Sequence, residues 1–222
     1  LADAAYTLQV GRRSMQLRRV VVADSTADAT AALADAQRVI TETAADVPRS
    51  VAFMFAGGGA QHPNMGRGLY DSEPVYRRAV DECLNILQSR LKLDLKVFLF
   101  PAAGQEDAAS EQLQRPSLAL PALLTTQYAQ AKLWQSWGVE PNAMIGHSMG
   151  EYTAAHLAGV FTLADALTLV ELRGRLFETL PEGAMLSVPL AEAELAPLLT
   201  PDLAIAVING PQLCVASGPV AS

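Results

Sequence analysis

The pentapeptide Gly-His-Ser-Met-Gly at positions 146–150 has the residue types and the spacing of a serine nucleophile. It follows the short apolar run 142–146 and precedes a helix-like stretch, so Ser148 is expected on a tight turn between a strand and a helix. Such a turn crowds neighbouring side chains against the backbone, which favours glycine two positions before and after the serine. The N–H groups that begin the helix would stabilise an oxyanion. The pattern predicts a serine that transfers or hydrolyses acyl groups, and the alternative is a turn without chemistry.

Three consecutive glycines, Gly57 to Gly59, follow a second apolar run at 51–55 that is expected to be a buried strand. A strand that runs into glycines must turn tightly or approach another group closely. A phosphate-binding loop is disfavoured because no Lys-Ser/Thr pair follows. Acyl-transfer sites need two N–H donors, one from the residue after the nucleophile and one from a separate loop. This loop is predicted to supply the second donor, and a tight turn without a chemical role is the alternative.

A serine hydroxyl with its ordinary pKa also needs a base within hydrogen-bond reach. The sequence has three histidines. His147 adjoins the serine, but adjacent side chains on a sharp turn point in different directions, so a packed and hydrogen-bonded role is expected. His156 is expected to face away from the site in a helical projection, and His62 is a candidate substrate contact beside the glycine loop. None of the three is a convincing base.

The helices that must position these groups are predicted from apolar periodicity and cap residues. The run 118–137 is long and apolar and stops at Gly138, as a helix would. Thr162 begins another helix, which extends to about Leu180. A capping residue and a proline at 71–74 open a further helix.

The sequence patterns of residues 1–47 and 184–222 differ from that of the segment between them. In residues 1–47, an apolar run at 20–23 and an alanine-rich segment predict a short strand and a helix that continues to about Thr43. Residues 184–222 predict a strand, a short helix and a hairpin, the start of a small ferredoxin-like α+β subdomain. Residues 48–183 are expected to form a large α/β subdomain, with a mostly parallel sheet flanked by helices as in α/β hydrolases.

Bulk composition narrows the functional classes. Half of the 222 residues are hydrophobic and 18% are charged, which suits a domain with a sizeable core. The formal net charge of −7 disfavours nucleic-acid binding. No apolar run is long enough to cross a bilayer, and the two cysteines have no CxxC neighbour. A cytoplasmic protein without a metal site or a bound cofactor is expected.

Three spaced motifs together resemble a known enzyme family. FAGGGAQ at 55–61 is similar to the opening motif of malonyl-CoA:acyl-carrier-protein transacylases, usually written FPGQGSQ. GHSMGEY at 146–152 resembles their nucleophile motif, and ELRGR at 171–175 resembles their arginine segment. Residues 1–23 resemble the linker that joins a ketosynthase to its acyltransferase. The chain is thereby identified as a member of the acyltransferase domains of modular type I polyketide synthases.

The resemblance implies roles for four residues. Ser148 would take the acyl group from acyl-CoA, the backbone N–H groups of Met149 and Gly58 would form the oxyanion hole, and Arg173 would hold the free carboxylate of the extender unit. Family members usually have Gln in place of Gly58 and often have Gln in place of Arg115. Their general-base histidine lies further along the chain than these residues extend, so a domain truncated on its C-terminal side is expected.

The reaction implied by the family moves an extender unit from acyl-CoA to the phosphopantetheine arm of an acyl carrier protein through an acyl-serine intermediate. An adjoining ketosynthase would be a further partner. Malonyl is favoured over methylmalonyl, because methylmalonyl-selective members often have Gln where Met149 stands. Two alternatives stay open: a serine thioesterase or other hydrolase, and a non-catalytic docking fragment, since the base is absent from these residues. The 222 residues alone are expected to be nearly inactive.

Overall fold

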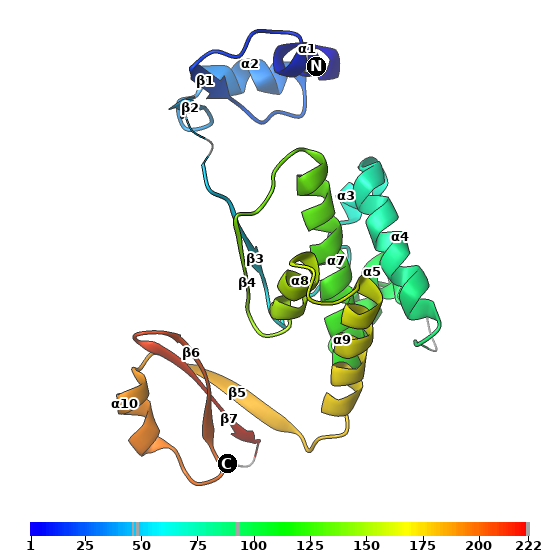
Figure 1. Ribbon diagram of the computed structural model, residues 1–222, viewed down its shortest axis with the longest axis vertical. Helices are drawn as coiled ribbons and strands as arrows, with labels where there is room; N and C mark the ends of the chain where they lie inside the picture. Colours follow the sequence, from blue (N-terminus) through cyan, green and yellow to red (C-terminus); the bar gives the residue numbers. More distant parts are fainter. Residues whose placement is uncertain (46, 48, 92–93, 221–222) are drawn as a thin grey trace. The chain divides into compact units, whose positions relative to one another are not determined.

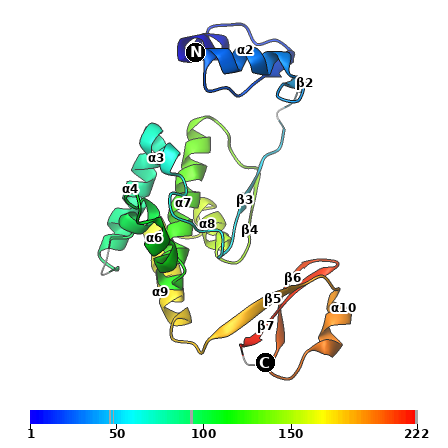
Figure 2. The ribbon, with the colours of Figure 1, turned by 180° about the vertical axis from the view of Figure 1, so that it is seen from behind.

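The computed structural model describes residues 1–45, 47, 49–91 and 94–220 (Figures 1 and 2). Its contacts divide the chain into two compact units, Leu1–Val51 and Ala52–Ser222. The predicted boundaries after residues 47 and 183 stay predictions. Because all the residues predicted to do chemistry lie in the second unit, its architecture decides how they meet.

The first unit contains two helices and one antiparallel strand pair. Its elements are α1 (Ala2–Val10), β1 (Leu17–Val20), α2 (Thr26–Ala34) and β2 (Ile40–Thr43), and Leu17 pairs with Thr43 while Val20 pairs with Ile40. Ser25 caps α2 by accepting a hydrogen bond from the Asp28 N–H. Among the described residues of this unit, Ala32 alone is fully buried.

Two details of the prediction for this unit were wrong. The helix ends at Ala34, and residues 40–43 form a strand where the helix was expected to continue. The first strand covers 17–20 and stops where the apolar run begins. The pairs between β1 and β2 join residues that are 20 to 26 positions apart, from Val20 with Ile40 to Leu17 with Thr43, and this pairing outweighs the local helix propensity that the prediction used.

The second unit is built around three helices packed side by side (Figures 1 and 2). The central one is α7 (Pro116–Ser136), which packs against α4 (Pro74–Gln88) and α9 (Leu163–Phe177). Thirteen of the residues of α7 are buried, because apolar side chains surround it on several sides. The Thr162 hydroxyl caps α9 by accepting from the Asp165 N–H, as predicted. The shorter helices are α3 (Arg67–Ser72), α5 (Lys96–Leu99), α6 (Glu106–Gln112) and α8 (Gly150–Leu157).

A parallel pair of strands carries the two predicted catalytic loops. β3 (Ala52–Phe55) pairs with β4 (Ala143–Gly146), in register from Ala52↔Ala143 to Phe55↔Gly146. Phe55 is buried, but Met54 and Ile145 are 80% and 60% exposed. The prediction of two buried strands is therefore wrong for one face of the sheet, because the described residues cover only the face that packs against α8.

The C-terminal part of the second unit is a small antiparallel sheet with one short helix, as predicted (Figure 1). The strands β5 (Gly183–Val188), β6 (Ala204–Gly210) and β7 (Leu213–Pro219) lie in the order β5-β7-β6. The helix α10 (Glu192–Leu195) continues into the 3-10 turn η1 (Ala196–Leu198). Leu195, Cys214 and Ala216 form its buried centre.

Candidate active site

The backbone around Ser148 is a sharp turn between β4 and α8. Ser148 has φ of 50°, in the left-handed region that residues with side chains seldom adopt. A Cβ added to Gly146 would lie 2.1 Å from the backbone nitrogen of Glu151, and one added to Gly150 would lie 2.2 Å from the carbonyl oxygen of Phe55. Neither position has room for any side chain. The prediction that this turn requires glycine on both sides of the serine is confirmed.

The glycine loop passes directly beside this turn. A Cβ added to Gly57 would lie 2.6 Å from His147 Nδ1 and 3.4 Å from Ser148 Cβ. The His147 N–H also donates to the Phe55 carbonyl at 2.9 Å, which extends the pairing of β3 and β4 into the turn. The two segments singled out from the sequence, 57–59 and 146–150, therefore meet at one place.

Backbone N–H groups without a hydrogen-bond partner among the described residues occur on both loops at this place. The N–H groups of Gly58 and Met149 have no hydrogen-bond partner in the described part of the chain, whereas the N–H of Gly150 donates to His147 and that of Gly59 donates to Gln61. Met149 directly precedes α8, whose first-turn N–H groups carry a partial positive charge. The arrangement supplies one free donor from each loop, as an oxyanion requires.

Arg173 lies on α9 between two aromatic rings. Its guanidinium carbon is 5.6 Å from the ring centroid of Tyr152 and 5.2 Å from that of Phe177. No carboxylate pairs with Arg173 among the described residues, whereas Arg175 on the same helix pairs with Glu171 at 2.7 Å. The two rings hold the cation by cation–π attraction and leave its N–H groups available to an anion. Neither ring was identified from the sequence as part of the site.

Arg115 takes part in a cluster of polar contacts at the start of α7. Its guanidinium lies 3.5 Å from Glu178, and that carboxylate accepts hydrogen bonds from the N–H and the hydroxyl of Ser117. Desolvation raises the pKa of Glu178, but the Ser117 hydrogen bonds and the Arg115 charge outweigh it and leave this pKa below its usual value. Arg115 therefore ties α7 to the end of α9.

All three histidines of the sequence are engaged elsewhere. His147 Nε2 lies 3.2 Å from Asn209 Oδ1 on β6, which confirms the expected hydrogen bond, but the residue is exposed and the expectation that it is packed was wrong. His156 Nδ1 lies 3.0 Å from the Phe161 carbonyl, and His62 Nδ1 lies 2.9 Å from the Pro63 carbonyl. Within the described residues no hydrogen bond joins a histidine to Ser148. No pattern in the sequence indicated that Asn209, from the small sheet, would contact the nucleophile turn.

A glutamine on α7 that the sequence analysis passed over connects the two loops. Gln127 Nε2 donates to the Ala56 carbonyl at 2.8 Å, and Gln127 Oε1 accepts from the Thr153 hydroxyl on α8 at 2.7 Å. Its only signal in the sequence is an amide inside a long apolar helix, and that signal does not reveal its partners.

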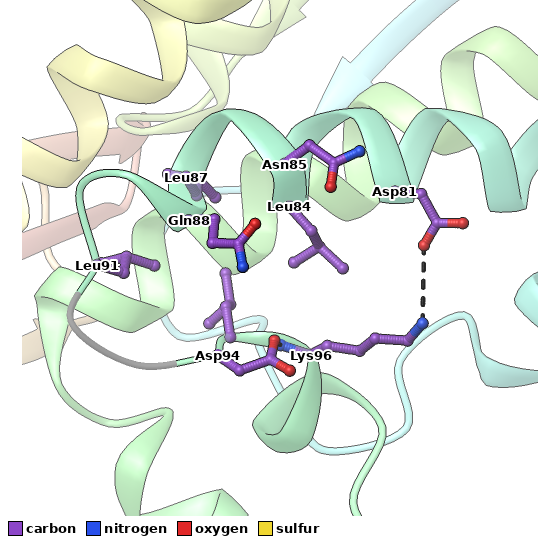
Figure 3. Close-up of a pocket in the computed structure, with 9 residues that line it drawn as sticks. Asp81, Leu84, Asn85, Leu87, Gln88, Leu91, Asp94 and Lys96 are labelled. Atoms are coloured by element: carbon purple, nitrogen blue, oxygen red, sulfur yellow. Dashed lines mark hydrogen bonds and ion pairs between the residues drawn. The ribbon is translucent and has the colours of Figure 1, made fainter.

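A cavity of about 600 Å³ lies away from these groups, along α4 and residues 91 and 94–96 (Figure 3). Asp81 and Lys96, which are 3.8 Å apart, lie at one side of it, and none of the predicted site residues lines it. The described residues contain no group of three or more histidine, cysteine or acidic side chains that could hold a metal ion. In the same part of the chain, no helix is long and apolar enough to span a membrane.

Comparison with known families finds a match in each unit. Residues 52–222 match the family described as acyl transferase domain, and residues 1–33 match the family described as CurL-like, PKS C-terminal. A component of the phenolphthiocerol/phthiocerol polyketide synthase of Mycobacterium tuberculosis is 37% identical over 232 residues, which cover 99% of this chain and 15% of that protein.

Comparison with solved structures gives the same family. The acyl transferase domain of ZmaA is 44% identical with a TM-score of 0.90, and the acyltransferase domain of the second salinomycin polyketide synthase module is 38% identical with a TM-score of 0.80. The matches cover 99% and 100% of this chain and 52% of each solved chain, so the chain spans about half the length of these domains. The α/β fold class and the family expected from the three motifs are confirmed. The chain belongs to the acyl transferase domain family, whose members among these relatives are acyltransferase domains of polyketide synthases.

Proposed function

We propose that this chain carries the nucleophile half of an acyltransferase that moves an acyl unit from acyl-CoA to the phosphopantetheine thiol of an acyl carrier protein. The observation that carries the proposal is the meeting of Ser148, on its strained turn, with the unpartnered N–H groups of Met149 and Gly58. Family membership supports acyl transfer over other serine chemistry.

In the proposed reaction, Ser148 Oγ attacks the thioester carbonyl and its proton passes to a base. The carbonyl oxygen becomes an oxyanion that accepts hydrogen bonds from Met149 and Gly58. Collapse of this intermediate breaks the carbon–sulfur bond, the CoA thiolate takes a proton, and the acyl group remains on Ser148 as an ester. The carrier-protein thiol then attacks this ester, and the serine proton is restored, which gives ping-pong kinetics.

The proposed acyl unit carries a free carboxylate, with malonyl favoured over methylmalonyl. The unpaired guanidinium of Arg173, held between Tyr152 and Phe177, supports a carboxylate-bearing substrate. A solved relative with a TM-score of 0.68, at 24% identity, is a malonyl CoA-acyl carrier protein transacylase from Clostridium perfringens, whose fold this chain shares. The choice of malonyl rests on Met149, where methylmalonyl-selective relatives often have Gln.

The proposed partners are an acyl carrier protein and an adjoining ketosynthase, with the whole assembly in the cytoplasm. The first unit supports a neighbouring domain, because it buries almost nothing by itself. Tyr6, Leu8 and Val22 are 68%, 70% and 84% exposed, which makes them candidate contacts for a neighbouring domain.

Mass spectrometry of the full-length protein tests the proposal. After incubation with malonyl-CoA, we expect a malonyl adduct on the peptide that contains Ser148, and the Ser148→Ala variant should carry none. Transfer of the label to an acyl carrier protein, faster than its release to water, separates a transferase from a hydrolase. Absence of an adduct with malonyl-, methylmalonyl- and acetyl-CoA would instead favour a non-catalytic docking role.

A further inference from the structure

The glycine loop between β3 and His62 is held by side chains. In the described structure, no backbone–backbone hydrogen bond outside the strands involves residues 56–61. The Ala56 carbonyl accepts from Gln127 Nε2, and the Gly59 N–H donates to Gln61 Oε1. A loop that must present the Gly58 N–H at a fixed position therefore depends on two glutamine amides.

Gln127 also holds the other side of the site. Its Oε1 accepts from the hydroxyl of Thr153, which is fully buried on α8, one turn after Gly150. One amide thus connects the loop that contains Gly58 to the helix that begins after Met149. The orientation of the amide is fixed, because the Ala56 carbonyl can only accept and so must face the NH₂ group.

We propose that Gln127 is a positioning residue for acyl transfer, which sets the spacing between the Gly58 and Met149 N–H groups through its bridge from Ala56 to Thr153. The inference rests on the proposed function. Gln127 touches neither Ser148 nor a reacting atom, so it acts through the two loops it joins. Oxyanion donors lose much of their effect when displaced by a fraction of a bond length, and a shift of about 1 Å can cost about 100-fold in rate.

The bridge makes a specific kinetic prediction for the full-length protein. Gln127→Met keeps the side-chain length and removes both hydrogen bonds. We expect the rate constant for acylation of Ser148 to fall about 10- to 100-fold, with KM for malonyl-CoA changed less than about 3-fold, because the donors act on the transition state. The matched control is Gln130→Met, an exposed glutamine on the same helix, which should behave as the unaltered protein.

Two further measurements separate positioning from folding. Thr153→Val should lower the rate less, and the double variant should be no slower than Gln127→Met alone, because both changes break one bridge. Hydrogen–deuterium exchange of peptides that span 55–62 should be faster in Gln127→Met than in Gln130→Met, while the melting temperatures of the two variants stay within about 3 °C.

The proposal is overturned if Gln127→Met acylates within 2-fold of the control, if the exchange of 55–62 is unchanged, or if the lost rate accompanies a large fall in melting temperature. The proposed function fails separately, if Ser148→Ala is acylated as fast as the unaltered protein or if the unaltered protein forms no acyl-serine. In that case the positioning role of Gln127 in acyl transfer is also disproved. The hydrogen–deuterium exchange data still report whether Gln127 stabilises residues 55–62.

Discussion

At the scale of single residues, the conformation of Ser148 is the central feature. A φ of 50° costs a residue with a side chain on the order of 1–2 kcal/mol, so it persists only where the surroundings enforce it. Here the backbone hydrogen bonds from His147 to Phe55 and from Gly150 to His147 hold the turn, and glycine at 146 and 150 permits the close approach of the backbone. This conformation changes the direction of the chain at Ser148, between β4 and α8. The N–H of the following residue, Met149, has no acceptor among the described residues.

The aromatic contacts of Arg173 predict which substrates depend on it. Arg173→Gln should lower kcat/KM for malonyl-CoA about 10- to 100-fold in the full-length protein, the range expected for losing hydrogen bonds to a charged group. Loading by acetyl-CoA, which has no free carboxylate, should change less than about 3-fold. The ratio of the two kcat/KM values is the measurement.

Arg78→Gln is the control for this prediction, since Arg78 is exposed on α4 and its replacement removes the same charge from the protein. Equal losses with both substrates would contradict a role in recognising the carboxylate and would indicate that Arg173 supports the packing of α8 and α9.

At the scale of elements, the start of α7 packs closely against the end of α9. A Cβ added to Gly174 on α9 would lie 2.4 Å from the Pro116 carbonyl oxygen, so the two helices approach as closely as glycine allows. At the same end, Glu178 accepts from the Ser117 N–H in the first turn of α7, which is a capping interaction supplied by another helix. This joint fixes the helix that carries Arg173.

The Glu178 cap predicts a pH-dependent contribution to stability. Glu178→Ala should lower the free energy of unfolding at pH 7 by about 1 kcal/mol, as the loss of a cap does. Because the pKa of Glu178 is depressed in the folded state, its contribution is present above the ordinary glutamate pKa of about 4.3 and is lost as pH falls through the folded value. Urea unfolding of the unaltered protein and of Glu178→Ala at pH 7 and pH 3.5 should show that the difference in free energy of unfolding is smaller at the lower pH.

Glu182→Ala, in the exposed segment before β5, is the control for this prediction. An equal difference between the unaltered protein and Glu178→Ala at both pH values would disprove the cap.

At the scale of the whole molecule, the described residues leave one face of the parallel sheet exposed and provide no histidine that bonds to Ser148. Parallel sheets are normally covered on both faces, yet Met54 and Ile145 lie side by side on an open face. None of the three histidines bonds to Ser148. The solved relatives are about twice as long as the part that matches this chain.

We therefore predict that the 222-residue chain alone is nearly inactive. In a burst assay with radiolabelled malonyl-CoA, acylation should be far below one equivalent on the timescale on which the full-length protein is fully labelled, because serine without a base is a poor nucleophile. The Ser148→Ala form of the same chain gives the background. Stoichiometric labelling at the rate of the full-length protein would contradict the prediction and show that these residues contain their own base.

The sequence by itself determined the features that depend on neighbours along the chain. The close approach of Gly146 to Glu151 and the cap that Thr162 provides for Asp165 are local contacts, which residue types and spacing report directly. The sequence also located the glycine loop at 57–59, although the contact of Gly57 with His147 came from the fold. The same motifs identified the family, and comparison confirmed it.

Only the tertiary structure decided the contacts between distant segments. Gln127 and Ala56 lie 71 residues apart, and His147 and Asn209 lie 62 apart, so no local pattern encodes either hydrogen bond. The rings of Tyr152 and Phe177 meet at Arg173 only because α8 and α9 pack together. The prediction of a helix as far as Thr43 was wrong for the same reason, because the pairing of β2 with β1 outweighed the local helix propensity. Composition and periodicity specify which element forms, whereas the packing of those elements specifies which side chains surround the serine.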